Sequence, residues 1–60
     1  MKVLIVDDES LALARLKRVL NDNNVFDIAE FSDPLEAIKE ISKTKFDVAL
    51  IKDLGLFLSL

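Results

Sequence analysis

Three short runs of mostly apolar residues most constrain what this chain can fold into. They occupy residues 3–6, 25–31 and 46–51, and two amphipathic stretches separate them. A run of apolar residues without regular polar alternation is typical of a strand that is covered on both faces, as in a parallel sheet. The order strand, helix, strand, helix, strand, with short connections, therefore predicts a single α/β domain built from parallel crossovers.

The two amphipathic stretches predict helices with recognisable ends. The first covers residues 10–20, with Ser10 as the expected N-cap, and the asparagine-rich residues 21–24 are expected to stop it. In the second, Asp33 is the expected N-cap and Pro34 suits the first helical position. Both helices follow a predicted strand closely, as the α/β interpretation requires.

The composition excludes several classes of function. The 60 residues include no cysteine and no histidine, which excludes disulfides, thiolate zinc sites, cysteine nucleophiles and histidine bases. Eight Lys and Arg stand against eleven Asp and Glu, and a net charge of −3 disfavours nucleic-acid binding. No apolar run has the length of a membrane span, and the first residues are too few for a signal peptide. We expect a cytoplasmic protein that binds neither nucleic acid nor membrane.

Acidic residues follow two of the predicted strands. Asp7, Asp8 and Glu9 end the first run, and Asp53 comes just after the third. Ligands of parallel sheets collect beyond the carboxyl ends of the strands, so these acids converge if the two strands are neighbours. Carboxylates without His or Cys suit Mg²⁺. The alternative is that they only cap the first helix and solvate the rim. Gly55 is the sole glycine, so no phosphate-binding loop exists, and no residue is predicted to be catalytic.

The last nine residues, 52–60, have a different pattern. Leucine at every second position from Leu54 to Leu60 alternates with residues that are also largely apolar. No helix cap or turn signal is present. We interpret this segment as an extra strand or an extended arm.

Residues 2–9, Lys-Val-Leu-Ile-Val-Asp-Asp-Glu, resemble the opening of a response-regulator receiver domain. Residues 11–20 resemble the first helix of the LytTR-type regulators, and residues 32–38 and 46–51 are similar to the second helix entry and the third strand of receivers. The resemblance implies a flavodoxin-like fold with strand order 2-1-3, Mg²⁺ held at Asp7 and Asp8, and a histidine kinase as partner. It also implies a phosphoacceptor aspartate at the end of the third strand.

The chain departs from this family pattern at the acceptor. Counted from the third strand, the acceptor position falls on Lys52, and Asp53 comes one residue late. Either Lys52 replaces the aspartate, or it is an insertion and Asp53 is the shifted acceptor. A shift of one residue turns a strand side chain to the opposite face, so Asp53 would need a bulge to re-aim it.

The resemblance covers residues 1–51, and the last two strands of the family have no counterpart in the sequence. We therefore expect residues 1–51 to form a truncated half receiver, with residues 52–60 as a divergent hydrophobic segment. The third strand would then be an open edge, and such edges pair readily with another chain. A homodimer is expected, with these candidate interface residues: Val48, Leu50, Leu54, Leu56, Phe57, Leu58 and Leu60. The alternatives are exchange of the arm between protomers and a partly folded monomer.

Two functions follow from these expectations. The first is a non-catalytic, self-associating half-fold of a two-component receiver domain that lacks a competent phosphorylation site. The alternative is a phosphoryl-accepting receiver in a phosphorelay, with Mg²⁺ at Asp7 and Asp8 and with Asp53 as acceptor.

Overall fold

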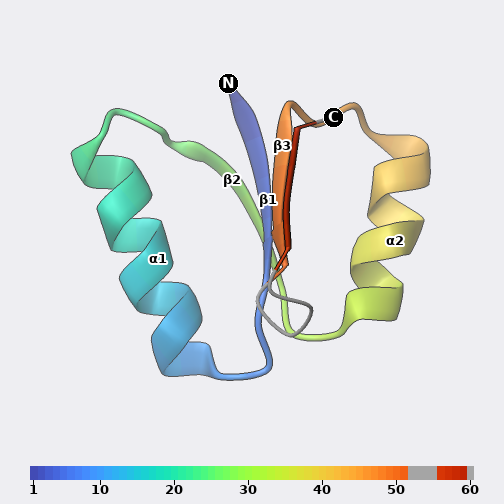
Figure 1. The fold of residues 1–60 in the computed structure, drawn as a ribbon, viewed down its shortest axis with the longest axis horizontal. Coiled ribbons are helices and arrows are strands. Elements are labelled where there is room, and N and C mark those ends of the chain that lie inside the picture. The colour runs from blue at the N-terminus through green and yellow to red at the C-terminus, as the bar shows by residue number, and fades with distance from the viewer. Residues whose placement is uncertain (52–55, 60) are drawn as a thin grey trace.

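The computed structural model describes residues 1–51 and 56–59, which form one sheet with a helix on each face (Figure 1). The strands are β1 (Lys2–Val6), β2 (Asp27–Phe31), β3 (Val48–Ile51) and β4 (Leu56–Ser59). The helices are α1 (Ser10–Asp22) and α2 (Pro34–Lys43). In Figure 1 the sheet is seen edge-on, with α1 and α2 on opposite sides of it.

The strand order is β2-β1-β3-β4, and the first three strands are parallel. The predicted βαβαβ arrangement with order 2-1-3 is thus confirmed. Val6 is the register partner of both Phe31 and Ile51. The three parallel strands therefore end together, and the residues that follow them emerge at one edge of the sheet.

β1 forms the centre of the core. Its residues alternate between the two faces, as strand geometry requires. Leu4 belongs to a cluster with Ala37 and Phe46 on the α2 side, and Ile5 belongs to a cluster with Leu13 on the α1 side. Leu4 and Ile5 are both 0% exposed. A strand that is buried on both faces explains why the first apolar run of the sequence has no polar alternation.

The helix starts agree with the sequence in one case and differ in the other. Asp33 is the N-cap of α2, as predicted, and its Oδ1 accepts a hydrogen bond from the Leu35 N–H at 3.0 Å. The prediction of Ser10 as N-cap of α1 is wrong, because Glu9 has the extended backbone of the cap and its carbonyl accepts from the Leu13 N–H at 3.1 Å. The Glu9 side chain makes no cap hydrogen bond.

Residues 56–59 form a fourth strand, β4. It pairs antiparallel with β3, with Val48 opposite Ser59 and Leu50 opposite Phe57. The expected open edge at β3 is therefore wrong, and the extra strand predicted as one of two possibilities is what forms. The physical reason is that an edge strand presents a row of unpaired backbone N–H and C=O groups, which β4 satisfies.

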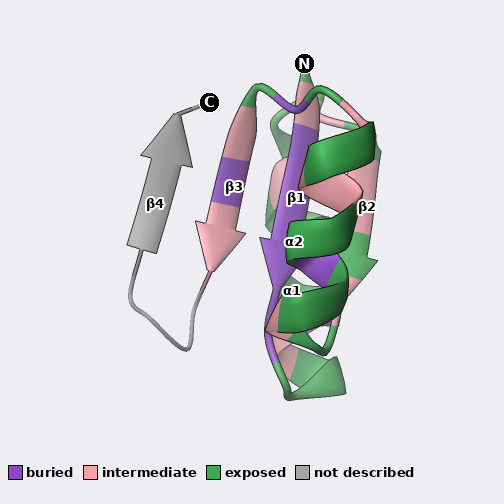
Figure 2. Ribbon diagram, turned by 90° about the vertical axis from the view of Figure 1, so that its right-hand side faces the viewer, coloured by how far each residue is buried: buried purple, intermediate pink, exposed green. Residues whose placement is uncertain are grey.

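The helices cover only part of the sheet. In Figure 2 they lie over β1 and β2, while β3 extends beyond them. Accordingly Val48, Leu50 and Ile51 of β3 are only half-buried, whereas Ala49 is buried. Within the described part of the chain, no helix is both long enough and apolar enough to cross a membrane.

Candidate functional site

Asp7 is the one buried charged residue among those described, with 3% of its surface exposed. It directly follows β1, and its backbone N–H donates to the Phe31 carbonyl at 3.1 Å, which extends the ladder between β1 and β2. Its Oδ1 accepts from the Glu9 N–H at 3.0 Å. This contact two residues along the chain is the Asx-turn geometry that Asp favours at the end of a strand. It turns the backbone from β1 into α1 and holds the carboxylate in place.

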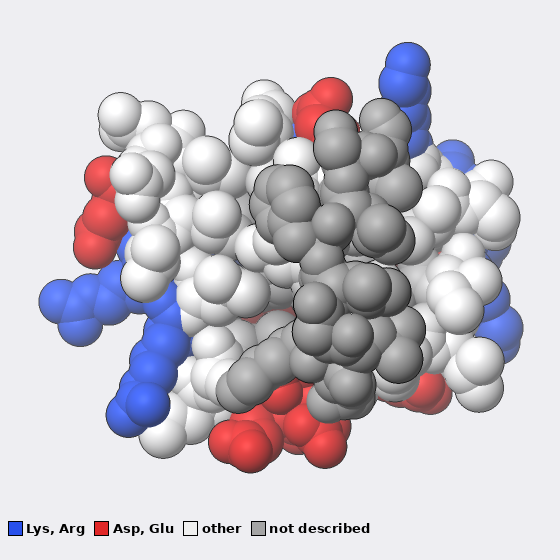
Figure 3. All heavy atoms as spheres, in the orientation of Figure 1, with Lys and Arg blue, Asp and Glu red and all other residues white. Residues whose placement is uncertain are grey.

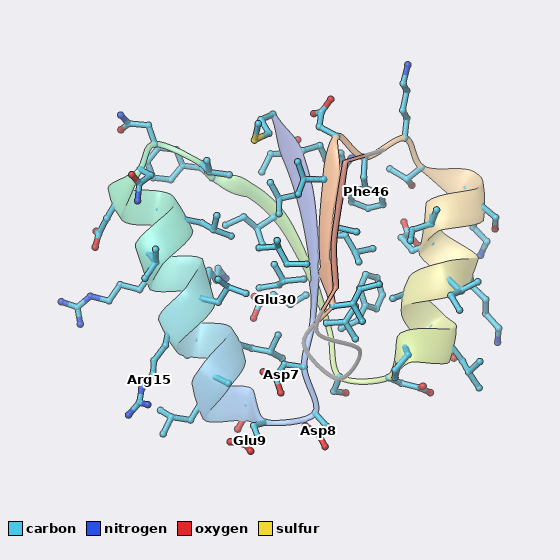
Figure 4. All side chains as sticks on the ribbon, viewed as in Figure 1. Asp7, Asp8, Glu9, Arg15, Glu30 and Phe46 are labelled. Carbon is cyan, nitrogen blue, oxygen red and sulfur yellow. The ribbon has the colours of Figure 1, made fainter. Side chains whose placement is uncertain are left out.

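Asp8 and Glu9 lie in the turn between β1 and α1, and both are exposed. Figure 4 shows the side chains of Asp7, Asp8 and Glu9 together at the end of the sheet where β1 runs into α1. Figure 3 shows acidic side chains gathered along the same lower border of the molecule. Negative charge at the N-terminal end of a helix is favourable, because the helix dipole is positive there.

Two basic residues of α1, Arg15 and Lys17, are directed away from this end of β1. Lys17 pairs with Glu30 of β2, with 2.8 Å between Lys17 Nζ and Glu30 Oε2. Arg15 of α1 points away from the sheet (Figure 4). This ion pair thus joins α1 to β2 and not to the acidic end of β1.

The chemistry of this edge is that of oxygen donors for a hard cation. Mg²⁺ is commonly held by one or two carboxylates, with water and phosphate oxygens completing its shell. Asp7 and Asp8 have the required chemistry and adjoin in sequence. Among the residues that the structure describes, no group of three or more acidic, His or Cys side chains is placed to hold a metal ion. Asp7 and Asp8 are thus two carboxylates of the kind that Mg²⁺ takes as ligands, without a third such group beside them in the described part of the chain.

The structure places only some of the other predicted site residues. Lys52 and Asp53, the two candidates for the acceptor position, lie outside the described residues, as do the interface candidates Leu54 and Leu60. Leu56, Phe57 and Leu58 belong to β4, for which the structure gives the backbone pairing alone. Val48 and Leu50 are half-buried against the cluster on the α1 face of the sheet.

The sequence interpretation did not include Asp33 among the acids of this edge. Asp33 comes two residues after β2, whose last residue Phe31 is in register with Val6. It therefore emerges at the same edge as Asp7. The signal was available, because the same rule that assigns Asp7 to the carboxyl end of a parallel strand applies to Asp33. The sequence assigns Asp33 only the role of N-cap of α2, which it also has in the structure.

Comparison with known proteins gives one match. The sequence model of a family described as the response regulator receiver domain matches residues 3–56. The matched range includes β1 except for its first residue, all of β2 and β3, both helices and the acidic residues after β1. No curated protein and no solved structure matches the chain.

Proposed function

Because this chain belongs to the response regulator receiver domain family, a family of signalling domains rather than typical enzymes, we propose that its receiver fold serves self-association and not phosphoryl transfer. Residues 1–51 supply the half receiver in this proposal, and residues 52–60 supply the divergent segment that includes β4. Partnership with a histidine kinase belongs to the alternative, in which the chain accepts a phosphoryl group.

The alignment of β1 with β3 is the observation that carries the proposal. Val6 and Ile51 are register partners, so the two strands end side by side. In the sequence, Asp7 follows the first and Lys52 follows the second. The resemblance to receivers assigns the acceptor to the position after the third strand. A lysine there has no carboxylate to form an acyl phosphate, and its ammonium group is a strongly hydrated point charge.

Asp53 is the competing acceptor in this chain. It follows Ile51 by two positions instead of one. Because side chains of an extended chain alternate between opposite faces, a shift of one residue disfavours the geometry that the family uses. This supports a receiver fold without a competent acceptor.

We further propose that Asp7 and Asp8 retain weak affinity for Mg²⁺. Asp7 is held by the Glu9 N–H and by the extension of the β1 ladder, so its carboxylate is oriented before any ion arrives. A bound Mg²⁺ would neutralise negative charge at this edge. Such binding alone does not make the chain a phosphoryl acceptor.

Labelling with acetyl phosphate and Mg²⁺, followed by intact mass measurement, tests the proposal. We expect no phosphoryl adduct on the 60-residue chain under conditions that label a complete receiver domain. Lys52→Asp restores a carboxylate at the counted acceptor position. We expect this variant to gain an adduct more readily than the unaltered chain.

The matched control is Asp53→Asn. An adduct on the unaltered chain that disappears in Asp53→Asn would overturn the proposal and establish the phosphoryl-accepting alternative.

Sedimentation equilibrium at several protein concentrations, with and without Mg²⁺, tests the proposed self-association. We expect a dimer that forms independently of Mg²⁺, and a monomer at all concentrations would refute self-association.

A further inference from the structure

The two outer edges of the sheet differ in charge. At one edge, β2 carries the exposed acids Asp27 and Glu30, and Glu30 is paired with Lys17. At the other edge, the β4 sequence is Leu-Phe-Leu-Ser, which contains neither a charged residue nor proline. Natural proteins commonly protect edge strands from other chains with charged side chains or proline. By sequence, the β2 edge has this protection and the β4 edge does not.

One side of β4 carries backbone N–H and C=O groups that do not face β3. A strand in an antiparallel ladder directs alternate N–H and C=O pairs to its two sides, and β3 occupies one side of β4. In the strand order β2-β1-β3-β4, no strand lies beyond β4 among the described residues. A further strand added there would continue the sheet through main-chain hydrogen bonds.

From this asymmetry we propose that β4 is the contact between two copies of this chain. β4 of one protomer pairs antiparallel with β4 of its partner about a two-fold axis, which joins two sheets into one. The inference rests on the self-association proposed above and names the surface that carries it. An isologous contact uses the same strand on both protomers, so the assembly closes at two copies.

The charges favour a second copy at β4 and disfavour one at β2. Pairing through β2 would place two acid-bearing strands side by side, each with Asp27 and Glu30, and like charges on neighbouring strands are destabilising. Pairing through β4 brings no charged residue of either strand opposite another. The β2 edges then lie at the two ends of the joined sheet, where their charge opposes further growth.

The position of β4 at the edge gives the contact an energetic reason. β4 has β3 as its one neighbour among the described strands, whereas β3 lies between β1 and β4. A short strand at an edge is held by one ladder only, whereas an internal strand is held by two. Pairing between two copies turns β4 into an internal strand and so secures the neighbour on which β3 depends.

Sedimentation equilibrium of two matched variants tests this surface. Leu58→Lys places a charge on β4, and Phe26→Lys places the same charge directly before β2, at a position that is 69% exposed. Each changes the net charge by one unit. In an isologous contact the new lysine occurs twice, so we expect Leu58→Lys to lower the association constant by about tenfold or more. We expect Phe26→Lys to leave it unchanged.

A cross-linking experiment covers the case in which Leu58→Lys fails to fold. The chain has no cysteine, so a single introduced thiol is unambiguous. Ser59→Cys is nearly isosteric and lies on β4, and Phe26→Cys lies beside β2. With a short bismaleimide, we expect a covalent dimer from Ser59→Cys and little from Phe26→Cys. Circular dichroism of each variant verifies the fold.

The outcomes separate this inference from the proposal on which it rests. A monomeric unaltered chain would refute self-association itself. An unaltered chain that dimerises while folded Leu58→Lys associates equally well, or while Phe26→Cys cross-links as efficiently as Ser59→Cys, would overturn the β4 contact alone. Species larger than a dimer would contradict the closed two-fold arrangement.

Discussion

Asn24 shows how a single residue ends a helix. It is the only non-glycine residue with positive φ among those described, at 63°. Its N–H donates to the Asn21 carbonyl at 3.0 Å, and the Val25 N–H donates to the Leu20 carbonyl at 2.9 Å. These two bonds form a Schellman motif, in which the residue after the cap is left-handed. Leu20 and Val25 then pack against the same cluster, which directs the chain toward β2.

Replacement of Asn24 tests this arrangement. We expect Asn24→Ala to lower the free energy of unfolding by about 1 kcal/mol, because a Cβ without a local hydrogen-bonding group is disfavoured in the left-handed region. Asn24→Gly is the matched control, since glycine adopts positive φ freely. Urea unfolding measures both. Equal stability of the two variants would contradict the account.

At the level of elements, α2 depends on its N-terminal cap. Asp33 accepts from the Leu35 N–H, Pro34 begins the helix, and Glu36 adds an acid to the first turn. α2 buries Ala37 against β1 and β2, so it covers these two strands on one face of the sheet. A weaker α2 therefore weakens the sheet beneath it as well.

Asp33→Ala removes the oxygen that accepts from Leu35, and we expect a loss of about 1 kcal/mol in the free energy of unfolding. Asp33→Ser retains a side-chain oxygen at the cap and should preserve most of the stability. The denaturant midpoint is the observable, and its slope should stay constant if only stability changes. A midpoint that is the same for Asp33→Ala and the unaltered chain would show that the cap contributes nothing.

At the scale of the whole molecule, the chain has little core for its stability. A domain of about 60 residues buries only about 60% of the surface that its unfolded chain exposes, and such domains are marginal. Here the two helices bury β1 and leave β2 and β3 largely half-buried or exposed. Association with a second copy would add stability that the single chain lacks.

If folding and dimerisation are coupled, thermal stability must depend on protein concentration. We expect the melting temperature to rise by about 3–5 °C for each tenfold increase in concentration. A tenfold change corresponds to about 1.4 kcal/mol per dimer, which is half of that value for each of the two small domains. Leu58→Lys should reduce this dependence. Calorimetry over a hundredfold concentration range decides the matter, and a constant melting temperature would argue against coupling.

The sequence by itself determined the elements and the place of the acidic site. The periodicity of the apolar residues predicted three strands and two helices, and the Asp–Pro pair predicted the start of α2, because these signals act within a few residues of each other. Asp7 and Asp8 were predicted at the carboxyl edge by the general rule for parallel strands. The strand order 2-1-3 came from family resemblance and is confirmed by the structure.

Only the tertiary structure decided which strand forms the edge and how far each is buried. That β4 pairs with β3 depends on backbone groups, which every residue possesses, so alternating leucines alone favoured a strand and an arm equally. The N-cap of α1 is Glu9 and not the predicted Ser10. The Asp7 side chain accepts a hydrogen bond from the Glu9 N–H, and this Asx-turn places Glu9 at the start of the helix. β1 and β3 have similar apolar sequences, yet β1 is buried and β3 half-buried, since burial depends on where the two helices lie.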